Sequence, residues 1–215
     1  MKIFDELQEC VITGNNKKSP ELVQEFLDAE KTAKDILDNG LLPAMQVVGK
    51  KFQDGEFFIP EMLLAARAMN AGLDLLKPLL EASDVQPVAK VVMGTVKGDL
   101  HDIGKNLVSI MLRGGGFEVI DAGSDVAPVR FVELAKENEA DIVGMSALLT
   151  TTMPAMKDTI AAFHAEGLGE KVKFMIGGAP ATREFANEIG ADGFAKNASQ
   201  AVDLARELKG VSAAI

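Results

Sequence analysis

The sequence predicts an all-α four-helix bundle followed by an α/β domain built on a doubly wound, five-stranded parallel sheet. Residues 1–84 show helical periodicity only, whereas short β-branched runs alternate with amphipathic stretches from Pro87 onward. A polar segment at 83–87 ends in that proline and separates the two patterns. We therefore expect a helical-bundle domain at residues 1–84 and an α/β domain at residues 88–215.

Four amphipathic stretches define the expected bundle. The second begins at Ser19 and Pro20, because a capping residue followed by proline is typical of a helix start. It stops near Asn39 and Gly40, where glycine favours a helix end. Connections this short place neighbouring helices antiparallel, as in a four-helix bundle. The expected helices span residues 3–13, 19–39, 42–53 and 60–82.

Five β-rich runs define the expected sheet, and each is followed by an amphipathic stretch. This alternation predicts parallel strands with helices on both faces of the sheet. Such sheets bind ligands beyond the carboxyl ends of their strands, so the loops after the first, third and fourth strands are the candidate site. The strands are expected at 90–93, 118–121, 141–145, 172–176 and 193–195, and the helices at 103–113, 129–138, 154–166, 181–189 and 199–208.

Composition excludes several classes of function. The 215 residues carry a net charge of −10 and no local block of Lys and Arg, which argues against nucleic acid as a partner. No apolar run reaches the roughly 18 residues of a membrane span, and the first residues lack a secretory h-region, so a cytoplasmic protein is expected. The single cysteine, Cys10, matches no zinc pattern and has no internal disulfide partner.

The loop after the first strand, residues 94–104, holds one imidazole between two carboxylates. It fits neither the dinucleotide fingerprint nor the P-loop. Asp99, two residues before His101, can accept an imidazole N–H and orient the ring, as carboxylates behind metal-bound histidines do. Zinc fits poorly, because the three or four ligands it needs do not cluster here. The alternatives are an ordinary surface loop for His101 and a solvated helix for His164, the other histidine.

Three motifs occur in order at those candidate loops. They are D-x-H-x-x-G at residues 99–104, S-x-L at Ser146-Ala147-Leu148, and G-G at Gly177-Gly178. The chain therefore resembles the B12-binding domains of methionine synthase and of the corrinoid proteins of methyltransferase systems. The resemblance covers nearly the whole chain, because residues 48–60 resemble the helical cap motif and residues 189–198 the final strand and turn. The run at 146–153 is most similar to methylamine and methoxyl corrinoid proteins.

The resemblance implies a cobalamin or related corrinoid whose cobalt takes His101 as its lower axial ligand. His101 would replace the dimethylbenzimidazole of methylcobalamin or cob(I)alamin, and the displaced base would enter a slot beside the sheet. Asp99 would hold the second ring nitrogen of His101. Thr152 would supply the hydroxyl that a serine supplies in methionine synthase. A hydrogen-bonded relay of histidine, aspartate and hydroxyl can take up a proton when the histidine leaves the metal. The oxidation state of the cobalt is thereby coupled to protonation of the relay.

The resemblance also implies further cofactor contacts. Ser146 would hydrogen-bond the buried benzimidazole, and Gly177 and Gly178 would leave room for the nucleotide tail. A simple tight turn is the alternative for the glycines, and a plain turn aspartate for Asp99. The other contacts implied in the α/β domain are Gly98, Leu100, Asp102, Gly104, Leu148, Thr150 and Ala198.

Three bundle residues, Phe52, Ile59 and Met62, match positions that cover the methyl face of the cobalt in methionine synthase. An apolar lid would shield reduced cobalt from water and oxidants. The alternative is that the three residues belong to the ordinary core of the bundle, since Met-rich helices are common packing elements.

The implied function is that of a corrinoid-carrying methyl shuttle. Cobalt(I) would accept a methyl group through one substrate-specific methyltransferase. Methyl-cobalt(III) would pass it through a second methyltransferase to a thiol or to a tetrahydropterin or tetrahydrofolate. A reductive activase is a further expected partner. The sequence carries no evident base for substrate activation, which favours the corrinoid subunit of a multi-component methyltransferase over a complete enzyme.

Methylamine, methanol, methoxyarene and betaine all stay open as methyl donors, because the substrate pocket would lie on another chain. Three other functions are alternatives. A B12-dependent sensor needs an added DNA-binding domain, and the small subunit of an adenosylcobalamin mutase usually lacks the helical cap. A phosphoacceptor receiver domain needs an aspartate at the end of the third strand, where Ser146 stands.

Overall fold

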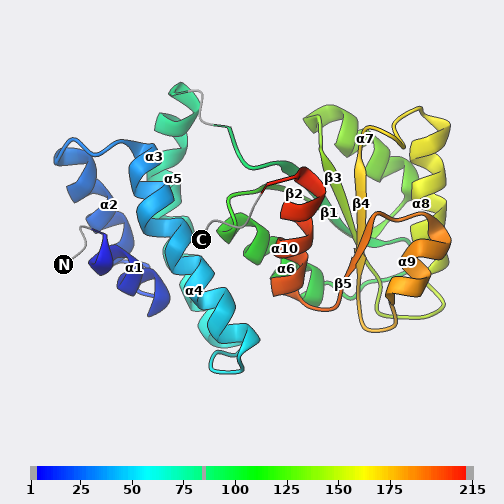
Figure 1. Ribbon diagram of the computed structural model, residues 1–215, viewed down its shortest axis with the longest axis horizontal. Coiled ribbons are helices and arrows are strands. Elements are labelled where there is room, and N and C mark those ends of the chain that lie inside the picture. The colour runs from blue at the N-terminus through cyan, green and yellow to red at the C-terminus, as the bar shows by residue number, and fades with distance from the viewer. Residues whose placement is uncertain (1–3, 84–85, 212–215) are drawn as a thin grey trace. The chain divides into compact units, whose positions relative to one another are not determined.

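The computed structural model describes residues 4–83 and 86–211, which divide into two compact units (Figure 1). The first unit runs to Gln86 and includes Gly114–Gly116, and the second holds the rest of the chain. The linker expected at 83–87 includes residues 84 and 85, which lie outside the described residues, as does residue 3, the first of the helix expected at 3–13.

The first unit is a bundle in which a long helix packs against three other helical rods. The third rod is continuous, because a short helix, a π-helical turn and a longer helix follow one another without a break. Helix α5 packs against α1, α2 and α4 of the described residues, which confirms the predicted helical bundle. The elements are α1 (Asp5–Ile12), α2 (Lys18–Asp28), α3 (Ala33–Ile36), η1 (Leu37–Leu41), α4 (Leu42–Gln53) and α5 (Ile59–Ala82).

The predicted extent of the second helix is wrong at its end. Helix α2 stops at Asp28, and Glu30 adopts a left-handed backbone with φ 61° that cannot continue it. Thr32 then caps α3 by accepting the Asp35 amide at 3.0 Å. Gly40 ends no helix: a Cβ there would lie 2.7 Å from the Leu7 side chain, so the glycine serves the packing against α1.

The second unit contains a parallel sheet with strand order β2-β1-β3-β4-β5. Helices α6 and α10 cover one face, and α7, α8 and α9 cover the other (Figure 1). This arrangement confirms the predicted doubly wound fold. The strands are β1 (Lys90–Val96), β2 (Glu118–Val126), β3 (Ile142–Ser146), β4 (Lys173–Gly177) and β5 (Gly193–Ala195); the helices are α6 (Ile103–Gly114), α7 (Pro128–Asn138), α8 (Pro154–Ala165), α9 (Arg183–Ile189) and α10 (Ala198–Lys209).

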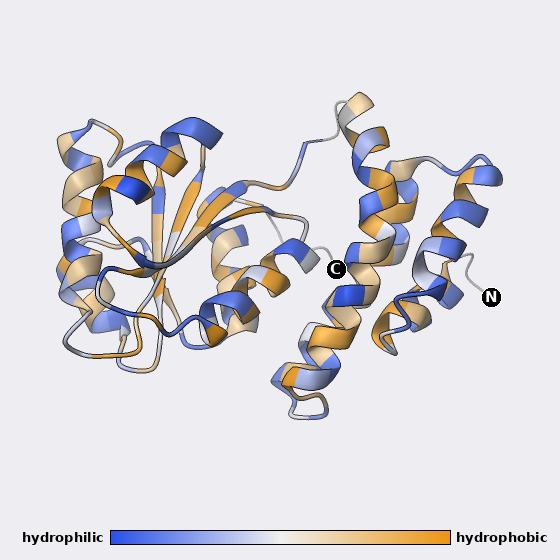
Figure 2. Cartoon of the chain, turned by 180° about the vertical axis from the view of Figure 1, so that it is seen from behind, coloured by the Kyte–Doolittle hydropathy of each residue, from blue (hydrophilic) through white to orange (hydrophobic). Residues whose placement is uncertain are grey.

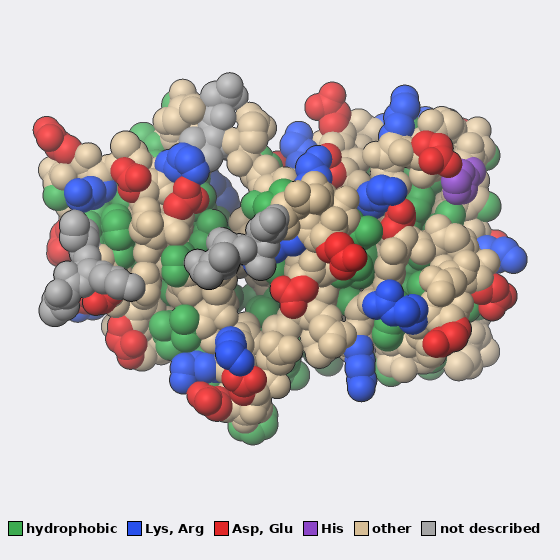
Figure 3. Space-filling model, viewed as in Figure 1, with side chains coloured by type: hydrophobic (Ala, Val, Ile, Leu, Met, Phe, Trp, Pro, Cys, Tyr) green, Lys and Arg blue, Asp and Glu red, His purple; other side chains and the backbone are tan. Residues whose placement is uncertain are grey.

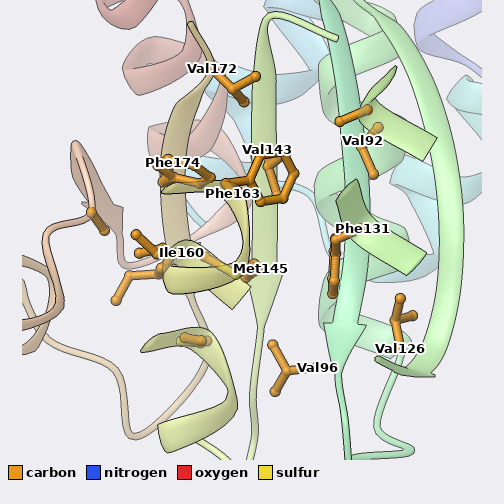
Figure 4. Close-up of a cluster of buried hydrophobic side chains, with 14 of the residues drawn as sticks. Val92, Val96, Val126, Phe131, Val143, Met145, Ile160, Phe163, Val172 and Phe174 are labelled. Atoms are coloured by element: carbon orange, nitrogen blue, oxygen red, sulfur yellow. The ribbon is translucent and has the colours of Figure 1, made fainter. Parts of the chain in front are cut away.

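The main core of this unit lies between the sheet and α7–α9 (Figure 4). Phe163 of α8 and Phe174 of β4 meet edge to face, with ring centroids 5.1 Å apart. Because helices cover both faces, the inner strands are apolar runs rather than alternating ones, as the colouring of Figure 2 illustrates. Gly94 lies inside β1. A glycine is required there, because a Cβ would lie 2.6 Å from the ring of Phe131.

The strand order reverses between β1 and β3, which creates the crevice where such sheets bind ligands. Thr95 pairs with Ser146, and Ser146 pairs with Gly177, so β1, β3 and β4 end at one edge. The three candidate loops therefore lie side by side.

On the face drawn in Figure 3, basic and acidic side chains are interspersed rather than gathered in blocks.

Candidate functional site

The site is built on the segment between β1 and α6, where Asp99 is wholly buried under His101. One carboxylate oxygen, Oδ1, accepts the backbone N–H of His101 at 3.0 Å and lies 2.8 Å from Nδ1 of its ring. The hydroxyl of Thr95, at the end of β1, donates to the His101 carbonyl at 3.0 Å. The backbone and the ring of His101 are thus both held from below.

The other oxygen of Asp99, Oδ2, is held by the loop after β3. It accepts the amide of Leu148 at 2.7 Å, the amide of Leu149 at 3.3 Å and the hydroxyl of Thr152 at 2.7 Å. The same hydroxyl lies 2.9 Å from the Leu149 carbonyl, so two acceptors compete for one proton. The contact predicted between Asp99 and Thr152 spans 53 positions of sequence and brings two of the candidate loops together.

These hydrogen bonds determine the charge of the buried carboxylate. Burial alone would raise the pKa of Asp99, but the bonds from the His101 and Leu148 amides, the Thr152 hydroxyl and the His101 ring hold that pKa well below its usual range. An ionised carboxylate only accepts hydrogen bonds, so the Nδ1 of His101 carries the proton. In the neutral form of this imidazole the lone pair lies on Nε2, and the side chain is 53% exposed.

Large exposed apolar side chains belong to the same two loops as the Asp99–His101 pair. Leu100 and Ile103 are 74% and 73% exposed, and Leu148 and Leu149 are also exposed. Exposed apolar side chains gathered in one place mark a surface that another molecule covers. A ligand at this site would meet one nitrogen donor and an apolar rim.

The glycines of the site fall into two groups. Gly178 is required by the protein itself, since its φ is 118° and a Cβ would lie 1.9 Å from the Ala147 carbonyl oxygen. Gly177 is tight as well, at 3.1 Å from the Ala195 carbonyl, and Gly98 has a φ of 85°. Gly104 differs: its φ is not positive, and a Cβ placed there would have nothing within 4 Å. The open space at Gly104 fits a ligand that approaches the backbone closely.

The remaining predicted contacts lie around these loops or in the first unit. Ser146 is half-buried at the end of β3, Thr150 is exposed, and Ala198 is buried at the start of α10. Asp102 is exposed and accepts the side-chain amide of Asn106 at 2.9 Å. In the first unit, Phe52 is half-buried, Ile59 is exposed and Met62 is buried.

Sequence reasoning missed three residues that support the site: Thr95, Lys105 and Asp125. Lys105 is 2% exposed and pairs with Asp121 of β2. It shares the buried face of α6 with Leu112, seven residues on, so a lysine on the apolar stripe was the signal that could have found it. Asp125 has no comparable signal, because an exposed aspartate in a strand reads as an ordinary solvated residue.

The donor set fits a metal held mainly by another ligand. Among residues 4–83 and 86–211, no three side chains of His, Cys, Asp or Glu gather where they could hold a metal ion. A macrocycle that supplies most of the metal's ligands and needs one axial nitrogen fits His101 and its apolar rim. In the same described ranges, every helix is too short or too polar to cross a membrane.

Comparison with known proteins identifies the group that such a site takes. A family described as the B12 binding domain matches residues 89–203, more than half of the chain, and a second family of that description matches residues 3–77. The fold and the site thus define a B12-binding protein. Dimethylamine corrinoid protein 1 of Methanosarcina acetivorans is 48% identical over 209 residues, which cover 96% of this chain and 97% of the relative. The dimethylamine corrinoid protein of Methanosarcina barkeri is 44% identical over 208 residues, with coverages of 96% and 97%.

The chain therefore belongs to the corrinoid proteins of methylamine methyltransferase systems. It binds a cobalamin or related corrinoid and serves as a methyl-group shuttle of a methyltransferase system. Two solved structures agree with this fold and cofactor. The methanol:cobalamin methyltransferase complex MtaBC from Methanosarcina barkeri matches with a TM-score of 0.87 at 27% identity, covering 98% of this chain and 81% of that chain. A cobalamin-binding protein from Desulfitobacterium hafniense DCB-2 matches with a TM-score of 0.76 at 33% identity, with coverages of 95% and 98%.

Proposed function

We propose that Nε2 of His101 is the lower axial ligand of the corrinoid cobalt, over the carboxyl ends of β1, β3 and β4. The observation that carries this proposal is the wholly buried Asp99, whose Oδ1 lies 2.8 Å from Nδ1 of His101. A carboxylate behind the ring fixes the tautomer and makes the opposite nitrogen a stronger donor. The exposed side chains of Leu100 and Ile103 support an apolar face for the macrocycle.

The bound corrinoid supplies a cobalt centre that accepts a methyl group from a donor and gives it up to an acceptor. His101, Asp99 and Thr152 would manage the axial position and its proton. Nε2 of His101, when it does not hold the metal, would take up a proton, and the charge of Asp99 would stabilise the imidazolium. The Thr152 hydroxyl, 2.7 Å from Asp99 and 2.9 Å from the Leu149 carbonyl, can turn toward either acceptor as the charge changes.

The hydroxyl of Ser146, a half-buried residue, would meet the displaced base of the corrinoid in this proposal. Gly177 and Gly178 would line the path of the nucleotide tail, beside Thr150 and Ala198. The bare backbone at Gly104, where a Cβ would have nothing within 4 Å, supports a close approach of the macrocycle there. Phe52, Ile59 and Met62 of the bundle would cover the opposite face of the cobalt and keep water from it.

We infer that a methylated amine is the methyl donor and that dimethylamine is the first substrate to test. The support is the 48% identity to dimethylamine corrinoid protein 1 over nearly the full length of both chains. A separate methyltransferase would hold the amine, and a second would pass the methyl group to a thiol or a tetrahydropterin or tetrahydrofolate. A reductive activase would restore oxidised cobalt. The cytoplasmic location expected from the sequence stays a prediction.

The test is reconstitution of the full chain with hydroxocobalamin, followed by reduction and methylation assays. We expect about one corrinoid per chain and methylation of the protein-bound cobalt by a dimethylamine methyltransferase. A methanol methyltransferase is the matched control and should methylate it far more slowly. Failure to bind corrinoid would overturn the ligand assignment, whereas equal methylation from methanol would overturn the substrate assignment alone.

A further inference from the structure

The carboxyl end of β2 departs from regular pairing beside the His101 segment. Met93 pairs with Asp121 and Val96 with Val126, so β1 advances three residues while β2 advances five over the same stretch. Two irregularities in the pairing account for the extra residues. Bulges of this kind bend a strand and re-aim its backbone, and they occur often next to functional sites.

The second irregularity places Asp125 in a left-handed conformation with φ 55°. Residues other than glycine adopt this conformation rarely, and they keep it where their surroundings hold them. Asp125 is held by the His101 segment in both directions: its N–H donates to the Asp99 carbonyl at 2.9 Å, and its Oδ1 accepts the Gly98 N–H at 2.7 Å. Gly98 also has a positive φ, of 85°, so both sides of this contact depend on unusual backbone geometry.

A second connection joins the same part of β2 to the first turn of α6. Oδ1 of Asp121 accepts the Gly123 amide at 2.9 Å and pairs with the ammonium group of Lys105, which is 2% exposed and lies four residues after His101. A lysine is buried this deeply only when its charge is paired. The segment that carries His101 is therefore tied to β2 before the histidine, through Asp125, and after it, through Lys105.

We propose that the bulged end of β2 is a clamp that aims the imidazole of His101, with Asp125 as its central positioning residue. The cobalt part of this proposal rests on the proposed function. Asp125 fixes the peptide groups of Gly98 and Asp99, and Asp99 in turn fixes the His101 amide and ring. A turn released at Gly98 would let the Asp99 carboxylate and the histidine above it move together.

Four substitutions of Asp125 separate the hydrogen bond from the backbone strain. Asp125→Asn keeps an acceptor and tolerates positive φ, so it should behave as the unaltered protein. Asp125→Gly keeps the backbone conformation and removes the acceptor. Asp125→Ala removes the acceptor and strains the backbone, and Asp125→Glu keeps the charge but displaces the acceptor by one methylene. Ser124→Ala, at the neighbouring exposed residue, is the matched control.

Two measurements on the full chain test the clamp. With hydroxocobalamin, Asp125→Gly should bind about tenfold more weakly, as a lost supporting contact behind a metal ligand does. Electron paramagnetic resonance of the cobalt(II) protein, with isotopically labelled histidine, should show a weaker coupling to the histidine nitrogen in Asp125→Gly and Asp125→Glu. Without corrinoid, amide exchange at Gly98 should accelerate in Asp125→Gly, but not in Asp125→Asn or Ser124→Ala.

Unchanged nitrogen coupling and unchanged Gly98 exchange in Asp125→Gly would overturn the clamp. If that variant does not fold, the same two results in Asp125→Glu would overturn it. The exchange measurement needs no corrinoid, so it tests the clamp even where the cobalt assignment is wrong. Absence of labelled-histidine coupling in the unaltered protein would overturn the proposed function instead.

Discussion

The amide of Leu148 lies 2.7 Å from Oδ2 of Asp99, a residue 49 positions earlier in the chain. This contact joins the loop after β3 to the loop after β1 through a carboxylate that has no access to solvent. The buried charge thus depends on donors from two loops, and its removal should affect both the stability of the domain and the alignment of His101.

Asp99→Asn should lower the free energy of unfolding by about 2 kcal/mol. The reason is that the NH2 group of the amide would replace one carboxylate oxygen and face hydrogen-bond donors. The sign of the pH dependence follows from the depressed pKa of Asp99 in the folded state. An aspartate in an unfolded chain has a pKa of about 4. The stabilisation of the folded state by ionised Asp99 is therefore present above that pH and is lost as the pH falls below it. Urea unfolding measured between neutral and acidic pH checks this.

The matched control for this prediction is Asp102→Asn, which removes the same charge from an exposed side chain three residues on. It should change stability by less than about 0.5 kcal/mol at any pH. The difference in the free energy of unfolding between the unaltered protein and Asp99→Asn should become smaller at acidic pH. A difference that stays constant down to the acid unfolding of the protein would show that the ionised form of Asp99 is not the stabilising one.

His101→Ala should remove the cobalt ligand and leave the fold intact. The side chain is 53% exposed, so the loss of stability should stay within about 1 kcal/mol. The measurement is electron paramagnetic resonance of the cobalt(II) protein with isotopically labelled histidine, in which the label should no longer alter the spectrum. His164→Ala is the control, because His164 is the only other histidine and lies exposed near the end of α8. A label effect that survives in His101→Ala would show that another residue is the ligand.

Much of this architecture could be predicted from the sequence, because parallel strands that are covered by helices on both faces consist of runs of apolar residues. All five strands and the helices that follow them overlap the predicted ranges, and the three motifs do fall at the ends of β1, β3 and β4. Strands β1 and β2 nevertheless continue to Val96 and Val126, past their predicted ends at 93 and 121. The ends of elements were harder. The sequence pattern places Gly94 in a loop, but it belongs to β1, where the ring of Phe131 leaves no room for a side chain. The need for glycine at position 94 comes from Phe131, 37 positions later in the chain (131 − 94), and the sequence around Gly94 does not reveal it.

The sequence prediction named the motif residues of the proposed site and missed the residues that support them. The Asp99, His101 and Thr152 contacts follow a sequence signature, whereas Asp125 acts through a backbone conformation that no periodic pattern encodes. Gly40 illustrates the opposite error. Glycine favours helix ends, but at this position it serves close packing against Leu7 in the middle of a continuous rod.

Thr152→Val should separate the role of the hydroxyl from that of the side-chain volume. The substitution leaves Oδ2 of Asp99 with the Leu148 and Leu149 amides and removes the donor at 2.7 Å. Stability should fall by about 1 kcal/mol, and the affinity for corrinoid by about tenfold, since a support of the metal ligand is lost. Thr152→Ser keeps the hydroxyl and should retain the affinity. Equal affinities of the Val and Ser variants, measured by titration with hydroxocobalamin, would contradict a role for the hydroxyl.

Ile59→Gln should expose the cobalt if the bundle covers the methyl face. Ile59 is 44% exposed, so a polar side chain there should leave the bundle folded, whereas the buried Met62 offers no such clean test. Leu75→Gln is the matched control. Leu75 is a 39% exposed apolar residue of the same helix, 16 residues on (75 − 59), or roughly 24 Å along its axis. Cobalt(I) bound to Ile59→Gln should oxidise faster in air than in the unaltered protein, because water and oxygen reach a less apolar cover more easily. Equal oxidation rates in Ile59→Gln and Leu75→Gln, followed by absorption after mixing with aerated buffer, would return Ile59 to the ordinary surface of the bundle.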